Sequence, residues 1–133
     1  MELRVGVKIL LKNKEGKYLV LKRSEEKYPE VGGKWDIPGG RIEPGSSLME
    51  NLRREVVEET GLQIVGEPKL LAAQDIIKAD KCKHVVRLTY SGEAEGEVKL
   101  SDEHDAFEWL PLEEIKEIPM LDKYLKQVLG LKL

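Results

Sequence analysis

The most informative segment of the chain is residues 40–62, GRIEPGSSLMENLRREVVEETGL. Ser47 and Glu50 have the spacing of a capping box, in which each side chain satisfies a free backbone N–H at the start of a helix. Apolar residues then recur at helical intervals, and Gly61 suits the left-handed conformation that ends many helices. The segment therefore predicts a helix over residues 47–60.

Three acidic residues crowd one turn of this expected helix. Glu55, Glu58 and Glu59 stand at positions i, i+3 and i+4, so their carboxylates project from one face. Like charges at this spacing repel by a few tenths of a kcal/mol per pair, and burial would raise their pKa values unless a cation compensates. A solvated helix face is the ordinary interpretation of such a run. Hard carboxylate oxygens are also the ligands that Mg²⁺ prefers, and a bound Mg²⁺ would remove the repulsion.

The residues before the helix favour the metal interpretation. Pro38, Gly39 and Gly40 form a glycine-rich loop whose backbone could approach a phosphate or a metal ion, and Arg41 and Arg54 place cations beside it. Carboxylates, glycines and arginines in one stretch indicate phosphate chemistry.

The same residues resemble the Nudix box of the Nudix hydrolases. The resemblance spans residues 40–62 and departs from the family pattern at one fixed position, where Ser46 stands in place of Glu. The positions that match are Gly40, Arg54, Glu55, Val56, Glu58, Glu59, Gly61 and Leu62. Six fixed residues at set spacing make this a specific motif.

The resemblance covers nearly the whole chain. Residues 19–23 and 35–40 look like the usual family lead-in, and residues 103–110 look like its closing strand. It implies a single small MutT-related domain over residues 1–133 with the Nudix fold. That fold belongs to the α/β (α+β) class and has a mixed β-sheet sandwiched between α-helices.

The resemblance also implies an activity. Family members hydrolyse a nucleoside diphosphate linked to another group, using Mg²⁺ or, as a substitute, Mn²⁺. The stretch at residues 77–80 has neither the Pro typical of ADP-ribose hydrolases nor the Tyr typical of dinucleoside polyphosphate hydrolases. The extra N-terminal domain common in ADP-ribose hydrolases also has no counterpart here. These absences favour a nucleoside triphosphate, cleaved to the monophosphate and pyrophosphate. The alternatives are an ADP-ribose or nucleotide-sugar pyrophosphatase and a non-catalytic nucleotide-binding module.

Roles follow for the acidic residues. The resemblance implies that Glu55, Glu58, Glu59 and the carbonyl of Gly40 hold the metal, with Glu58 also counted among the catalytic residues. Either Glu55 or Glu103 is the general base. Glu103 precedes the last expected strand, and a solvated loop acid is its alternative interpretation.

Roles follow for the cationic residues as well. Arg23 and Arg41 are candidates for substrate phosphate contacts, because a guanidinium can hold two phosphate oxygens at once. In the family the helix arginine, here Arg54, organises the acidic cluster by pairing with the box glutamate that Ser46 replaces. Ser46 offers a hydroxyl but no charge, so this support is expected either to be weaker or to come from another acid such as Glu43 or Glu50.

Hydrophobic patterning predicts the remaining elements. Residues 4–22 are expected to form a hairpin and residues 23–45 a loop. Trp35, Phe107 and Trp109 are expected in the core, and His104 on a loop, partly exposed. Further strands are predicted at residues 63–65, 70–77, 84–90 and 106–110, and helices at 112–117 and 120–129.

Composition excludes several classes of protein. A formal net charge of -3 and a pI near 5.6 argue against a protein that coats a polyanion such as nucleic acid. The single cysteine, Cys82, excludes an internal disulfide and a thiolate zinc site. Because neither a signal peptide nor a membrane span is evident, we expect a cytoplasmic protein that binds a small nucleotide and no membrane. Family members are often dimers, so a homodimer is a further possibility.

Overall fold

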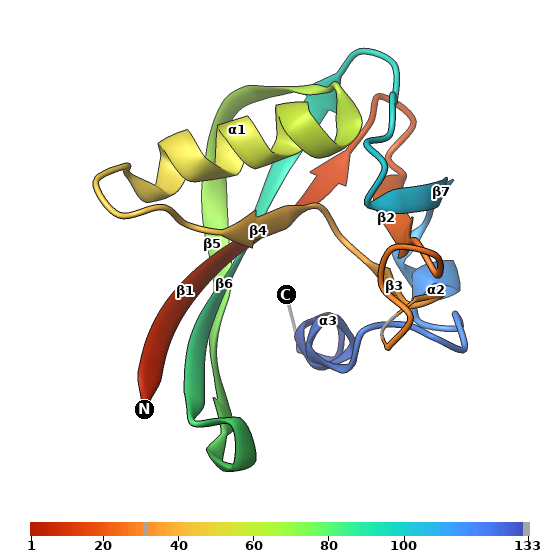
Figure 1. The fold of residues 1–133 in the computed structure, drawn as a ribbon. Helices are drawn as coiled ribbons and strands as arrows, with labels where there is room; N and C mark the ends of the chain where they lie inside the picture. The colour runs from red at the N-terminus through yellow and green to blue at the C-terminus, as the bar shows by residue number, and fades with distance from the viewer. Residues whose placement is uncertain (31, 132–133) are drawn as a thin grey trace.

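The computed structural model describes residues 1–30 and 32–131; residue 31, inside the loop expected at 23–45, and residues 132–133 lie outside the described part. The described residues form a mixed seven-stranded sheet with helices on both sides (Figure 1). Its elements are β1 (Glu2–Lys12), β2 (Tyr18–Arg23), β3 (Trp35–Asp36), β4 (Gly39–Arg41), α1 (Leu48–Thr60), β5 (Gln63–Lys78), η1 (Ala79–Lys81), β6 (Lys83–Glu95), β7 (His104–Leu110), α2 (Leu112–Ile115) and α3 (Lys123–Leu129).

Strand β1 organises the sheet. It pairs in parallel with β6 along its whole length and antiparallel with β4, where Val7 lies opposite Gly40. Alternate residues of β1 face opposite sides, as in any strand. Val7, Ile9 and Leu11 pack with α1 in one core, whereas Leu10 packs with α2 and α3 in a second. The expected mixed sheet between helices is therefore confirmed.

Helix α1 has the ends that the sequence predicts. The Ser47 hydroxyl accepts a hydrogen bond from the backbone N–H of Glu50 at 3.1 Å, so Ser47 is the N-cap. At the other end Gly61 has a φ of 73° and donates its N–H to the carbonyl of Val57 at 2.9 Å. Leu52 and Val56 are fully buried against the sheet, which fixes which face of the helix carries the acidic residues.

Several sequence predictions need correction. The hairpin over residues 4–22 is present only at its closed end, where Lys12 lies opposite Tyr18 in an antiparallel pair. Farther along, β1 pairs with β4 at residues 6–8, and β2 pairs with β3 and β7. The loop at residues 23–45 contains the short strands β3 and β4, and the strands expected at 63–65 and 70–77 are one long irregular strand, β5. The last two helices are shorter than expected, at Leu112–Ile115 and Lys123–Leu129.

The aromatic residues divide between core and surface. Trp35 and Trp109 are partly buried and pack against the two cores, as expected. Phe107 is 41% exposed, so its placement in the core was wrong; it lies on β7, where alternate side chains face solvent.

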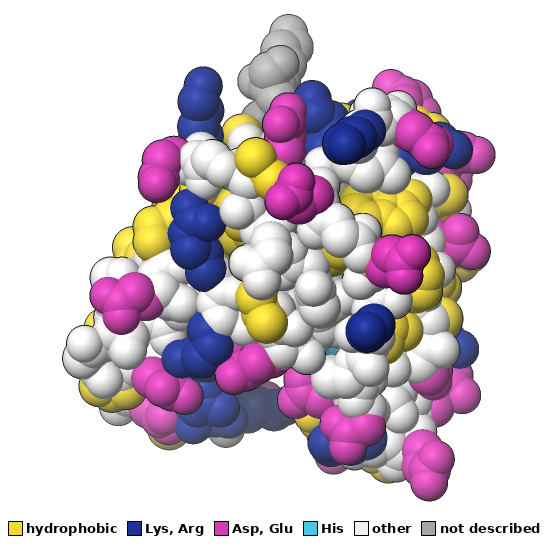
Figure 2. Space-filling view, turned by 90° about the horizontal axis from the view of Figure 1, so that it is seen from above, with side chains coloured by type: hydrophobic (Ala, Val, Ile, Leu, Met, Phe, Trp, Pro, Cys, Tyr) yellow, Lys and Arg dark blue, Asp and Glu magenta, His cyan; other side chains and the backbone are white. Residues whose placement is uncertain are grey.

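The molecular surface is densely charged. On the face that shows α1, acidic and basic side chains are intermixed among the described residues (Figure 2). No helix in residues 1–30 and 32–131 is long and apolar enough to cross a membrane.

Candidate active site

A cavity of about 930 Å³ opens where α1, β4 and the start of β1 meet the loop before β7. It brings together residues that lie as far apart as 2 and 103 in the sequence. Among the predicted site residues, those that line it are Arg23, Gly40, Arg41, Glu55, Glu59 and Glu103.

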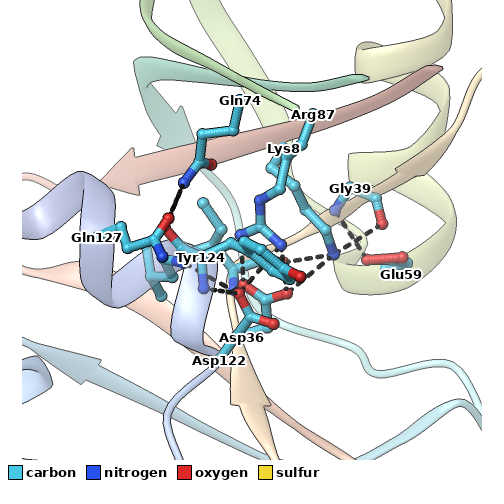
Figure 3. Close-up of polar contacts among 11 residues, drawn as sticks. Lys8, Asp36, Gly39, Glu59, Gln74, Arg87, Asp122, Tyr124 and Gln127 are labelled. Atoms are coloured by element: carbon cyan, nitrogen blue, oxygen red, sulfur yellow. Dashed lines mark hydrogen bonds and ion pairs between the residues drawn. The ribbon is translucent and has the colours of Figure 1, made fainter. Parts of the chain in front are cut away.

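Glu59 is the buried acid of the site. It is 5% exposed, and its Oε1 accepts the backbone N–H of Gly39 at 3.1 Å. Burial raises the pKa of Glu59 to about 7, although the positive charge of Lys8 and the hydrogen bond from Gly39 act in the opposite direction. The Lys8 ammonium donates to the carbonyl of Ile37 at 3.2 Å. It also lies 3.5 Å from the carbonyl of Gly39 (Figure 3). The carboxylate therefore stands in a setting that favours an added cation.

Close packing requires glycine at the first two positions of β4. Gly39 has a φ of 138°, and a Cβ on it would lie 2.0 Å from the carbonyl oxygen of Val7. A Cβ on Gly40 would lie 2.7 Å from Oε2 of Glu55. Glycine at these positions lets β4 approach β1 and lets the Glu55 carboxylate rest against the backbone of β4.

Arg54 gathers the acidic residues of α1. Its guanidinium lies 3.2 Å from Glu55 Oε1 and 3.7 Å from Glu58 Oε1, and Glu43 Oε2 lies 3.1 Å from Nη1. The hydrogen bond to Glu55 and the charges of Glu43 and Glu55 raise the pKa of Arg54. Of the two acids expected to compensate for Ser46, Glu43 is the one in contact with Arg54.

Ser46 contributes through its backbone. Its carbonyl accepts a hydrogen bond from Asn51 Nδ2 at 3.1 Å, and Asn51 Oδ1 accepts from the N–H of Glu43 and from Arg54 Nη2. Asn51 is completely buried. This amide therefore ties the loop that carries Glu43 to the helix that carries Arg54.

Glu103 also lines the cavity, from the turn before β7, and is only partly exposed. It accepts a hydrogen bond from the Tyr28 hydroxyl at 3.0 Å, and the guanidinium of Arg23 lies 4.9 Å from the centre of the Tyr28 ring. Loss of solvation and this hydrogen bond raise the pKa of Tyr28, so the phenol remains a donor at neutral pH. The structure thus places Glu103 in the site rather than on a solvated loop.

Two predicted residues are placed differently. The Glu58 side chain is 60% exposed, and Glu58 is not among the described residues that line the cavity. His104 was expected on a loop and partly exposed, but it begins β7 and is 8% exposed. Burial, followed by the positive charges of Arg23 and Lys8, lowers the pKa of His104 to about 4, so the ring is neutral at pH 7.

Four further residues contact the site but belong to no sequence motif: Lys8, Tyr28, Glu43 and Asn51. Lys8 and Tyr28 reach it through tertiary contacts that sequence spacing does not reveal. Glu43 was expected from the sequence as a partner of Arg54, and Asn51 gave a local signal, as a polar residue on the apolar side of a predicted amphipathic helix.

The donor set suits a divalent cation. Glu55, Glu59 and Glu103 offer hard carboxylate oxygens around one cavity, and Mg²⁺ is usually bound by only a few carboxylates together with water and substrate phosphate. In residues 1–30 and 32–131 no three acidic, His or Cys side chains already form a metal cage. Two features nevertheless fit such an ion. Glu59 is a buried carboxyl with a raised pKa, and the Glu55 carboxylate lies against the backbone of Gly40.

Comparisons with known proteins agree on one family. A family model described as NUDIX domain matches residues 2–129. The nucleoside triphosphatase NudI of Escherichia coli is 32% identical over 126 residues, covering 86% of each chain. The crystal structure of a MutT protein from Methanosarcina mazei superposes with a TM-score of 0.83 at 34% identity, covering 96% of this chain and 90% of that one. A MutT NUDIX hydrolase from Burkholderia pseudomallei gives a TM-score of 0.81 at 27% identity, covering 97% of both chains.

Proposed function

The chain belongs to the Nudix family and is a Nudix hydrolase, and we propose that it converts a nucleoside triphosphate and water to the nucleoside monophosphate and pyrophosphate with bound Mg²⁺. The relative NudI, named as a nucleoside triphosphatase, supports this substrate class over a nucleotide sugar or ADP-ribose.

The observation that carries the proposal is the composition of the cavity. Acidic Glu55, Glu59 and Glu103 share it with the arginines Arg23 and Arg41. Phosphoryl chemistry requires mainly positioning and neutralisation of charge, which this combination of a metal-binding and a phosphate-binding wall provides.

The arginines bind the substrate in this proposal. Arg41 follows the glycine turn on β4 with an exposed side chain, and Arg23 ends β2 beside Tyr28. Each guanidinium can hold two oxygens of the phosphate chain, which orients the bond to be cleaved toward the carboxylates.

The carboxylates hold the metal and prepare the water. Glu55, Glu59 and the Gly40 carbonyl form the proposed ligand set, with Glu58 added from the next turn of α1. When bound there, Mg²⁺ neutralises charge on the phosphate oxygens. The described polar contacts of the two candidate bases differ. Arg54 holds one oxygen of Glu55, whereas the only described side chain that holds Glu103 is the neutral Tyr28 hydroxyl. We therefore assign Glu103 as the residue that accepts a proton from the attacking water.

Product analysis tests the proposal. Purified protein with Mg²⁺ is incubated with the common nucleoside triphosphates, ADP-ribose and a nucleotide sugar, and monophosphate, pyrophosphate and orthophosphate are quantified. We expect equal amounts of monophosphate and pyrophosphate from at least one triphosphate. If only ADP-ribose or the nucleotide sugar is cleaved, that compound takes the place of the nucleoside triphosphate as the substrate class. If none of the compounds is cleaved, the result favours a non-catalytic binding module.

A further inference from the structure

The end of β2 and the start of β7 meet at an irregular point of the sheet. The two strands pair antiparallel, and their register shifts just before Arg23, which lies opposite His104 (Figure 1). Irregularities of this kind re-aim neighbouring side chains and are frequent beside active sites. The turn that follows β2 therefore lies next to the turn that carries Glu103.

Two contacts fasten these turns together. The buried Ser24 donates its N–H to the carbonyl of Glu103 at 2.9 Å. Lys27 Nζ lies 3.0 Å from Asp102 Oδ1. Ser24 also organises its own turn, because its carbonyl accepts the N–H of Tyr28 at 3.1 Å and its hydroxyl accepts that of Lys27 at 3.3 Å. Tyr28 is thus held against a residue 75 positions farther along the chain.

The half-buried side chain of Tyr28 contacts a proposed phosphate-binding residue and the proposed base at once. Its hydroxyl donates to Glu103 Oε1 at 3.0 Å, and the Arg23 guanidinium lies 4.9 Å from the centre of its ring. All three residues line the catalytic cavity. Within the described part of the chain Arg23 forms no ion pair, so the Tyr28 ring is the contact that locates its charge.

The hydrogen bond from Tyr28 restricts how the Glu103 carboxylate can turn. A general base must lie within hydrogen-bond reach of the proton that it takes, so its orientation matters as much as its basicity. The phenol fixes Oε1. The second oxygen of Glu103 is left to accept the proton of the attacking water.

We propose that Tyr28 is a positioning residue that links the Arg23 guanidinium, which binds phosphate, to the Glu103 carboxylate, which accepts the proton. This inference rests on the proposed function, because it assigns a further residue to the same reaction. The ring and the hydroxyl have separable tasks. Removing the hydroxyl releases Glu103 alone, whereas removing the ring releases Arg23 as well.

Steady-state kinetics of Tyr28→Phe and Tyr28→Leu separate the two tasks. The substrate is the nucleotide that the wild type cleaves with Mg²⁺. For Tyr28→Phe we expect kcat to fall by at least about tenfold and KM to stay within about twofold of the wild type, because the ring still locates Arg23. Tyr28→Leu should show the same loss in kcat and, in addition, a KM that is at least about fivefold higher.

A double-mutant cycle distinguishes positioning from a structural role. In a Glu103→Gln background the phenol has no carboxylate to orient, so adding Tyr28→Phe should change kcat by less than about twofold. An equal loss in both backgrounds would show a merely structural role and overturn the inference. Tyr18→Phe is the matched control, because it removes the same hydroxyl from a half-buried tyrosine that is not among the described residues lining the cavity. It should leave kcat within about twofold of the wild type.

Calorimetric binding of inorganic pyrophosphate with Mg²⁺ tests the contact with Arg23 without turnover. We expect the affinity to fall by at least about fivefold in Tyr28→Leu and to stay within about twofold in Tyr28→Phe. If the wild type cleaves a nucleotide, an unchanged kcat in Tyr28→Phe or an undiminished pyrophosphate affinity in Tyr28→Leu would overturn the inference and leave the proposed function standing. A wild type that cleaves no nucleotide would reject both.

Discussion

The buried carboxylate of Glu59 has the most perturbed environment in the catalytic cavity. Its pKa is raised from the usual glutamate range to about 7, chiefly by burial. The folded state therefore binds this proton more tightly than the unfolded state does. The contribution of Glu59 to the free energy of unfolding falls as the pH rises from about 4.5 to about 7. Above that range the folded state bears the full cost of holding the buried carboxylate in its charged form.

Replacing Glu59 with Gln should remove this penalty while keeping the size of the side chain and an oxygen for the Gly39 N–H. In metal-free buffer at pH 8 we expect Glu59→Gln to be more stable than the wild type by up to about 3 kcal/mol, and nearly equal to it at pH 4.5. Urea denaturation at the two pH values measures the difference. A stability difference that does not change with pH would contradict the assigned burial cost.

The pairing of Arg54 makes a second prediction. Glu43 is 69% exposed, and an exposed ion pair contributes about 0–1 kcal/mol, so Glu43→Gln should lower kcat by about two- to fivefold. Because the Nudix box pattern has Glu where this chain has Ser46, Ser46→Glu in that background should restore the rate. Ser46→Glu alone should change kcat by less than about twofold. A large gain from Ser46→Glu alone would show that Glu43 does not compensate for the missing box glutamate.

Among the elements, α1 was predictable because its signals are local. Ser47, Glu50 and Gly61 specify its ends. The helical spacing brings Glu55 and Glu59 to the cavity, whereas the Glu58 side chain is mostly exposed. The glycines were expected to let the backbone approach a phosphate or a metal ion, and the sequence did not indicate that Gly39 packs against Val7 or Gly40 against Glu55.

Elements that depend on distant partners were not predictable. The alternation in β1 indicated a strand, but nothing in it showed that β6, some eighty residues away, would be its main neighbour. For the same reason the sequence concealed that Tyr28 contacts Glu103 and that the fold buries His104. Periodicity reports which face of an element is buried, whereas pairing and burial of polar side chains depend on the whole sheet.

Asn51 allows a test of how α1 holds the preceding loop. Its Nδ2 donates to the carbonyls of Ser46 and Ser47, at 3.1 and 2.6 Å. Asn51→Asp keeps the shape but sets carboxylate oxygens against these carbonyls, so we expect a loss of about 2–3 kcal/mol in stability. Urea denaturation of Asn51→Asp and of the exposed control Gln63→Glu measures it. A loss below about 0.5 kcal/mol would show that the loop does not depend on this amide.

At the scale of the whole molecule, an ion network joins the start of α3 to strands β1, β3 and β6 of the sheet. Asp122 caps α3 and pairs with Arg87, which also holds Asp36 beside Lys8. Although burial alone would raise the pKa of Asp36, Lys8 and Arg87 outweigh it and lower that pKa. Asp36 therefore contributes stability above its unfolded pKa and loses it as the pH falls.

Removing Arg87 should expose the strength of this network. Arg87→Met leaves Asp36 without its main partner, and because Asp36 remains partly exposed we expect a loss near the lower end of the range for buried pairs, about 3 kcal/mol. Lys27→Met, which breaks the exposed pair with Asp102, should cost less than about 1 kcal/mol. Denaturant unfolding at pH 7 measures the loss of stability in both variants. Equal effects would mean that the network adds no more than a surface ion pair.

The central claim is that the cavity around Glu59 is the catalytic centre, and turnover of a nucleoside triphosphate with Mg²⁺ by Glu59→Gln tests it most directly. Glu50→Gln is the matched control, since it removes the same charge from an exposed position on the same helix. We predict that Glu59→Gln stays folded and loses at least about 100-fold in kcat, while Glu50→Gln stays within about twofold of the wild type. A near-wild-type rate in folded Glu59→Gln would contradict the account.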